Sequence, residues 1–180
     1  MKKNIVLYSS LLGFIIIMFV AIMLYLVVLY PIRYKDTIRK YGEIYNIDPE
    51  IICSIINIES GFDKNAESSV GARGLMQIMP NTAYEIADKL NISDFTLDML
   101  FSPEINIRMG CYYINYLASM YEDLDNIVAS YNAGFNKVNE WLKSEEYSSN
   151  GVVDNPPIKE TKQYIKKFHK NLNVYKNRIN

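Results

Sequence analysis

The sequence predicts an all-α protein in which one apolar N-terminal helix precedes a single helical domain. A run of 26 residues without charge lies near the start, at 5–30. Further on, Asp48-Pro49 and Ser102-Pro103 each place a capping side chain before a proline, and apolar residues then recur at spacings of three and four, which is typical of helices. No stretch alternates apolar and polar residues as a strand would, and the sequence has no glycine-rich phosphate loop and no repeat.

The apolar segment 5–30 is predicted to cross a membrane. As a helix it would extend about 39 Å at ~1.5 Å per residue, more than a hydrocarbon core of about 30 Å requires. A cleavable signal peptide is the alternative, but it would have an apolar core of about 7 to 15 residues and a small-residue cleavage site, and neither is found before Arg33. We therefore expect an uncleaved signal anchor at 5–30 and a cytoplasmic N-terminus at 1–4.

The segment 31–46 is polar and is predicted to form a helical stalk that leads into a domain at 47–180. The first helix of this domain should begin at Asp48-Pro49 and end where Gly61 offers a left-handed stop. Further helices are expected at 83–90, from Ser102-Pro103 to about 116, at 123–131, at 135–143 and at 159–177, with an exposed loop at 144–157.

Glu59 is the candidate general acid. It follows Ile52, Ile55 and Ile56 at helical spacing, so its carboxyl lies on the stripe that the isoleucines bury. Apolar neighbours and the negative end of the helix dipole both raise the pKa of a carboxyl, and a carboxyl that stays protonated near neutral pH can donate a proton. The alternative is that Glu59 turns to the helix edge and is solvated.

The residues after Glu59 are typical of a shaped binding loop. Gly61, Gly71 and Gly74 interrupt a polar segment, which brings backbone close to a ligand. Gln77 then lies within an apolar run, where its amide needs partners such as a sugar hydroxyl or acetamido group.

Charge and cysteine content exclude several classes of function. All 20 acidic residues follow the apolar segment, so this part of the chain has no basic excess and is not expected to bind nucleic acid. Two cysteines and one histidine do not make a metal site, and we expect no metal and no cofactor. Cys53 and Cys111 are either two buried thiols or, in an oxidising compartment, a disulfide.

Three segments together resemble the signature blocks of the lytic transglycosylases of the soluble (SLT), goose-lysozyme-like type. They are ESGF at 59–62, SSVGARGLMQ at 68–77 and SYNAG at 130–134, in the family's order and approximate spacing. The resemblance covers about 41–175 and implies the lysozyme-like α fold. Two positions depart from the pattern, Phe62 and Ser130, and neither affects the chemistry.

The resemblance also implies the reaction. Glu59 would protonate the oxygen between N-acetylmuramic acid and N-acetylglucosamine while the substrate's acetamido group stabilises the developing positive charge. Glu59 would then take the proton of the muramoyl 6-hydroxyl, which closes on the anomeric carbon to give a 1,6-anhydro product. Because peptidoglycan lies outside the cytoplasmic membrane, the resemblance places the domain on the extracytoplasmic side; charge counting alone does not favour this orientation.

The resemblance implies further site residues at positions that match the family's motifs. Ser68, Met76 and Gln77 match groove-lining residues, and Tyr131 and Asn132 match the third block, in which the tyrosine hydroxyl orients the glutamate. Plain core packing is the alternative for Met76.

Glu160 and Tyr164 resemble the Glu-Thr and following Tyr at the start of the family's last helix, where both would contact the substrate. For Glu160 the alternative is a first-turn glutamate that favours the helix N-terminus.

Two further functions stay open. A muramidase hydrolysing the same bond would need a second, water-activating carboxylate such as Asp63 or Glu160. A weakly active wall-binding assembly subunit would keep the groove but not need Glu59. Partners of such proteins include secretion, conjugation and sporulation machinery, among which the sequence does not choose.

Overall fold

The computed structural model describes the backbone of residues 2–179 and the side chains of residues 11–179. The chain divides into two units, one up to Pro31 and one from Ile32 onward. Within the described residues the only β contacts are isolated bridges, at Glu67–Arg73, Arg73–Ile78 and Ser149–Val152. The predicted all-α class is therefore confirmed.

The first unit consists of helix α1, Lys2–Leu29. Within it, Leu11–Leu29 is long and apolar enough to cross a membrane, judged by length and composition. No charged residue interrupts this stretch, and apolar side chains occupy every face of the helix. A helix that is apolar all round has no side suited to water, so the predicted apolar N-terminal helix is present.

Helix α2, Lys35–Tyr45, corrects the prediction of a stalk at 31–46. The segment is helical, but it packs against α5, Pro103–Ala118, as part of the domain. Ile38 is fully buried and Tyr41 is 6% exposed, and the Tyr41 hydroxyl donates to Glu104 Oε1 at 2.7 Å. Gly42 lets the Ile47 carbonyl approach α2 closely, so the chain can turn directly from α2 toward the next helix.

Helix α3, Pro49–Glu59, begins and ends as the sequence predicts. Pro49 occupies the first turn and Asp48 the N-cap position, although the Asp48 side chain makes no capping hydrogen bond. Ile52, Ile55 and Ile56 are buried along one stripe, and Gly61 adopts a left-handed conformation with φ 59° just beyond the helix end. The stripe therefore leads directly to Glu59, the last residue of α3.

The remaining helices follow the predicted order, with ends that differ by a few residues. One element was not predicted, the short 3-10 helix η1. The elements after α3 are α4 (Pro80–Lys89), η1 (Leu97–Phe101), α5 (Pro103–Ala118), α6 (Leu124–Ala133), α7 (Phe135–Trp141) and α8 (Lys159–Tyr175).

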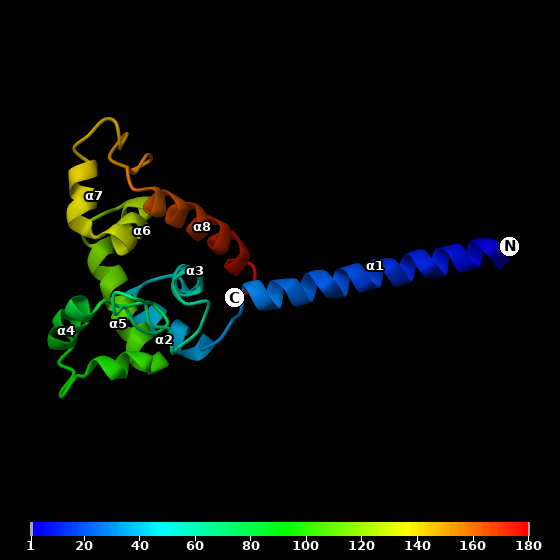
Figure 1. The fold of residues 1–180 in the computed structure, drawn as a ribbon, viewed down its shortest axis with the longest axis horizontal. Helices are drawn as coiled ribbons and strands as arrows, with labels where there is room; N and C mark the ends of the chain where they lie inside the picture. The colour runs from blue at the N-terminus through cyan, green and yellow to red at the C-terminus, as the bar shows by residue number, and fades with distance from the viewer. Residues whose placement is uncertain (1, 180) are drawn as a thin grey trace. The chain divides into compact units, whose positions relative to one another are not determined.

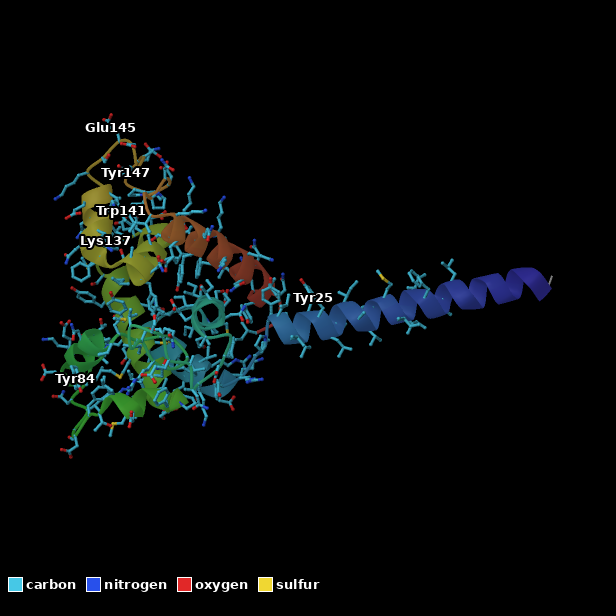
Figure 2. The ribbon with its side chains drawn as sticks, viewed as in Figure 1. Tyr25, Tyr84, Lys137, Trp141, Glu145 and Tyr147 are labelled. Atoms are coloured by element: carbon cyan, nitrogen blue, oxygen red, sulfur yellow. The ribbon has the colours of Figure 1, made fainter. Side chains whose placement is uncertain are left out.

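Helix α8 closes the domain by packing on both α3 and α6, which Figure 1 shows beside it. Helix α7 and the loop after it lie at one end of this unit and α4 at the other (Figure 1). Trp141 on α7 lies at the first of these ends, with Glu145 and Tyr147 of the loop (Figure 2). Because Trp141 is only 6% exposed, the single tryptophan serves the core and not a surface for sugars.

Cys53 on α3 and Cys111 on α5 are both fully buried and both free. The structure thus supports the interpretation as two buried thiols and not the alternative of a disulfide. Burial raises the pKa of Cys53 to about 12 and raises that of Cys111 as well, so neither is a reactive thiolate near neutral pH.

Candidate active site

Glu59 meets Tyr164 where the end of α3 packs on α8. The Tyr164 hydroxyl donates to Glu59 Oε1 at 2.6 Å, and Tyr164 itself is buried, with 6% of its surface exposed. The α3–α8 packing holds both side chains in place, so the hydrogen bond fixes the direction of the Glu59 carboxyl. Glu59 is partly exposed, which leaves it open to a ligand on one side.

The surroundings of Glu59 raise its pKa from 4.5 to about 7. Burial is the largest cause, because the charged form loses solvation, and the negative charge of Glu160 adds to it. The Tyr164 hydrogen bond acts in the opposite direction, since it stabilises the ionised carboxylate. A carboxyl with a pKa near neutrality can give and take a proton within one reaction, as acid and base catalysis both require.

The loop between α3 and α4 is fixed by hydrogen bonds to the helices around it. Ser60 Oγ donates to the Leu75 carbonyl at 2.8 Å. The buried Asn106 of α5 donates to the carbonyls of Arg73 and Leu100, each at 2.9 Å, and accepts from the Met76 backbone N–H at 2.8 Å. Gly74 is needed beneath this amide, because its φ is 75° and a Cβ there would collide with Asn106 and Leu100.

This loop forms one wall of a cleft of about 260 Å³. Every residue that lines the cleft is uncharged, and Tyr113 and Tyr131 lie in it with ring centroids 5.5 Å apart. Gln77 adopts φ 46°, and its Nε2 donates to the carbonyls of Ala66 and Gly74. The lining residues are Gln77, Ile78, Met79, Thr82, Tyr113, Tyr131, Asn132, Ala133 and Gly134.

Glu59 lies in a second pocket, of about 190 Å³, which adjoins the cleft through Asn132. The Thr161 hydroxyl donates to Asn132 Oδ1 at 2.8 Å and so ties α8 to the end of α6. In contrast to the cleft, this pocket contains charged residues. Its lining is Ile58, Glu59, Asn132, Glu160, Gln163, Tyr164 and Lys167.

The structure brings four of the predicted site residues into one pocket, Glu59, Asn132, Glu160 and Tyr164, and places Gln77 and Tyr131 in the adjoining cleft. Tyr131 lies near enough to Glu59 for the charge of that carboxyl to act on it, but its hydroxyl is bonded elsewhere. Its hydroxyl donates to the Met76 carbonyl at 2.8 Å, and this single proton is not available to Glu59 as well. Tyr164 makes that contact instead.

Ser68 and Met76 have structural contacts where groove contacts were expected. The Met76 side chain is fully buried and fills the space above Gly110, which agrees with the alternative of core packing. Only its backbone carbonyl reaches the cleft wall, through Tyr131. Ser68 Oγ accepts from the Ala72 backbone N–H at 2.9 Å and so closes the turn within the loop.

The other loop carboxylates already have partners. Asp63 Oδ1 accepts from the Asn65 backbone N–H at 2.9 Å, and Glu67 forms an ion pair with Arg73 at 3.0 Å. Neither lines the pocket around Glu59, whereas Glu160 does.

Sequence reasoning missed Asn106, Tyr113 and Lys167. The helical spacing of Asn106 among the apolar residues of α5 was a signal for a buried amide. Lys167 lies seven positions after Glu160 and three after Tyr164, so the face of α8 that carries those residues also carries Lys167.

The family model described as "Transglycosylase SLT domain" matches residues 36–151, well over half of the chain. The chain belongs to the SLT-domain transglycosylase family. The match begins within α2, which agrees with the packing of that helix into the SLT domain.

Individual relatives support the same family membership. The soluble lytic murein transglycosylase of Salmonella typhimurium is 34% identical over 142 residues, which are 76% of this chain and 22% of that protein. Membrane-bound lytic murein transglycosylase C of Actinobacillus pleuropneumoniae is 31% identical over 68% of this chain and 35% of its own length.

Solved structures show the same SLT-domain fold. An inactive mutant of the lytic transglycosylase Slt from Pseudomonas aeruginosa matches with a TM-score of 0.78 and 30% identity, over 85% of this chain and 25% of that one. The 70 kDa soluble lytic transglycosylase of Escherichia coli matches with a TM-score of 0.75 and 30% identity, over 82% and 25%. The chain thus spans about a quarter of these larger proteins, and the lysozyme-like fold is confirmed.

Proposed function

We propose that this protein is a membrane-anchored lytic transglycosylase. It would cleave the β-1,4 bond between N-acetylmuramic acid and N-acetylglucosamine in peptidoglycan and leave 1,6-anhydro-muramoyl ends. The observation that supports this most directly is the state of Glu59, a partly buried carboxyl with a pKa near 7 in a pocket that adjoins an uncharged cleft. Family membership and the named relatives support the same substrate.

The chemistry follows from the position of Glu59. Protonated Glu59 donates its proton to the bridging oxygen as the bond to the anomeric carbon breaks. The acetamido group of the substrate stabilises the positive charge on that carbon. The Glu59 carboxylate then accepts the proton of the muramoyl 6-hydroxyl as its oxygen bonds to the anomeric carbon, so protons balance and no water is consumed. One residue with an intermediate pKa serves both steps.

A muramidase is the second candidate, and the position of Glu160 is the observation that favours it. Glu160 lines the same pocket as Glu59, and inverting hydrolases place a second carboxylate across the bond to activate water. The products separate the two reactions, since hydrolysis leaves reducing ends.

The deciding experiment uses the full chain in detergent micelles with purified peptidoglycan, beside the Glu59→Gln variant. We expect mass spectrometry to find 1,6-anhydro-muropeptides from the wild type, and Glu59→Gln to lower their release by about 10²- to 10⁴-fold, which is the contribution of a positioned general acid. Reducing ends would indicate the muramidase, and equal release by both proteins would exclude Glu59 as the acid.

The anchor is the apolar stretch Leu11–Leu29, and a single-pass orientation would place the SLT domain outside the cytoplasmic membrane. Cell fractionation tests this: the chain should stay in membranes at high pH and high salt, and external protease should digest the domain in spheroplasts. Recovery in the soluble fraction would contradict it.

Wall remodelling, or local opening of the wall for a secretion, conjugation or sporulation apparatus, is the role we propose for the anchored enzyme.

A further inference from the structure

We infer that the pocket beside Glu59 binds a carboxylate of the stem peptide on the glycan strand, and that Lys167 is the residue that binds it. This inference rests on the proposed function, because the ligand is peptidoglycan. The cleft and the pocket that adjoins it differ in charge. No residue that lines the cleft is charged, whereas Glu59, Glu160 and Lys167 all line the pocket.

Lys167 reaches the pocket because of the periodicity of α8. Glu160, Gln163, Tyr164 and Lys167 follow one another at spacings of three, one and three, which places them on one face of the helix. Tyr164 defines the direction of this face, since its hydroxyl binds Glu59. The Lys167 ammonium group is therefore presented on the same side as the candidate acid.

Lys167 has no ion pair with a carboxylate among the described residues. Glu160 lies two turns away, about 10 Å along the helix at ~1.5 Å per residue, and in the described part of the chain it forms no ion pair with Lys167. Lys162, on another face of α8, donates to Asn155 instead. The pocket thus contains a cation available to a ligand.

The chemistry of peptidoglycan supplies a matching anion. The sugar rings and their acetamido groups are neutral and suit the uncharged cleft. The lactyl ether of N-acetylmuramic acid carries a stem peptide, whose side and terminal carboxylates are ionised unless amidated. With the sugar in the cleft, Asn132 lies at the border where this substituent would leave the ring and enter the charged pocket. Lys167 then selects strands whose stems keep a free carboxylate.

The test measures binding in the full-length Glu59→Gln chain in micelles, so that no cleavage occurs. The probes are two tetrasaccharides whose stem peptides differ only in one carboxylate, free in the first and amidated in the second. We expect calorimetry to give a Kd about three- to fivefold lower for the free carboxylate, as for a solvent-accessible ion pair, and this preference to shrink with added salt. Adding Lys167→Met should make the two Kd values equal, whereas adding Lys167→Arg should keep the preference.

Lys166→Met is the matched control, because it removes the same charge from an exposed neighbour that does not line the pocket, and it should keep the preference. The inference is overturned if the parent chain shows no preference, if the preference survives Lys167→Met, or if Lys166→Met removes it equally. Cleavage by the wild-type chain is measured separately. Failure of cleavage with the preference intact would overturn the proposed activity alone, and the reverse result would overturn this inference alone.

Discussion

Tyr164 and Glu59, 105 residues apart in the sequence, share a 2.6 Å hydrogen bond between the last helix and the candidate acid. The bond favours the ionised carboxylate, while burial and Glu160 favour the protonated one. The pKa of Glu59 near 7 is the balance of these effects, and each can be changed separately.

Tyr164→Phe should raise the pKa of Glu59 further, because the carboxylate loses a stabilising donor. We expect the alkaline limb of kcat/KM to move to higher pH by about one to two units, given that a hydrogen bond to a charged group contributes ~1.5–3 kcal/mol and one pKa unit is ~1.4 kcal/mol. Tyr112→Phe on α5 is the control for loss of a hydroxyl and should leave the limb in place. A shift to lower pH would contradict the assignment.

Glu160→Gln should have the opposite effect, since it removes the negative charge that raises the pKa of Glu59. The alkaline limb of kcat/KM should move to lower pH by a few tenths of a unit, because Glu160 is exposed and its charge is screened. The shift should become smaller at high salt. Loss of all cleavage, with no residual anhydro product, would instead indicate that Glu160 takes part in the chemistry.

Glu59→Gln should stabilise the fold at alkaline pH. Between pH 4.5 and about 7 the folded protein keeps a proton that the unfolded chain has released, so the free energy of unfolding falls as pH rises through this window. Removing the carboxyl should raise the unfolding free energy at pH 8 by on the order of 2 kcal/mol and have a much smaller effect at pH 5. Denaturant titrations at both pH values measure this. Glu145→Gln, in the exposed loop, is the control, and an equal effect of Glu59→Gln at both pH values would disagree with a raised pKa.

Gly74→Ala should destabilise the SLT domain far more than Gly61→Ala. Both glycines have positive φ, but a Cβ at Gly74 would collide with Leu100 and Asn106, whereas nothing lies within 4 Å of one at Gly61. We expect losses of about 3 kcal/mol or more at Gly74 and about 1 kcal/mol at Gly61. The midpoint of thermal unfolding would rank the two variants, and an equal loss would show that the space beneath Asn106 is not filled as described.

Cys53 and Cys111 should react with iodoacetamide only after unfolding, and without any reductant. Burial withholds both thiols from the reagent and raises the pKa of each. Intact mass spectrometry should show two added carbamidomethyl groups in denaturant and none in the folded chain. A mass lower by two hydrogens that resists alkylation would establish the disulfide instead.

Local patterns were sufficient to predict most helices and the candidate acid. The Asp48-Pro49 start, the isoleucine spacing and Gly61 are all short-range signals, and together they placed Glu59 at the end of a buried stripe. The packing of α2 could not be predicted in this way, because its partner is α5, where Tyr41 bonds Glu104 more than sixty residues away.

The arrangement around Glu59 was only partly predictable for the same reason. The matched motifs indicated that Tyr131 and Tyr164 both belong to the site, but which hydroxyl binds Glu59 depends on how α6 and α8 pack. Met76 illustrates the limit of position matching: its side chain is buried, and its backbone carbonyl contributes to the cleft wall.

The three hydrogen bonds of the Asn106 amide have a consequence for ligand affinity. They hold the loop that walls the cleft from within the core, so its backbone is ordered when the domain folds. A ligand that enters the cleft therefore meets a surface whose conformational entropy is already lost, and little of the interaction free energy is spent on ordering the protein. The entropy that remains to be lost on binding is mainly that of the ligand itself.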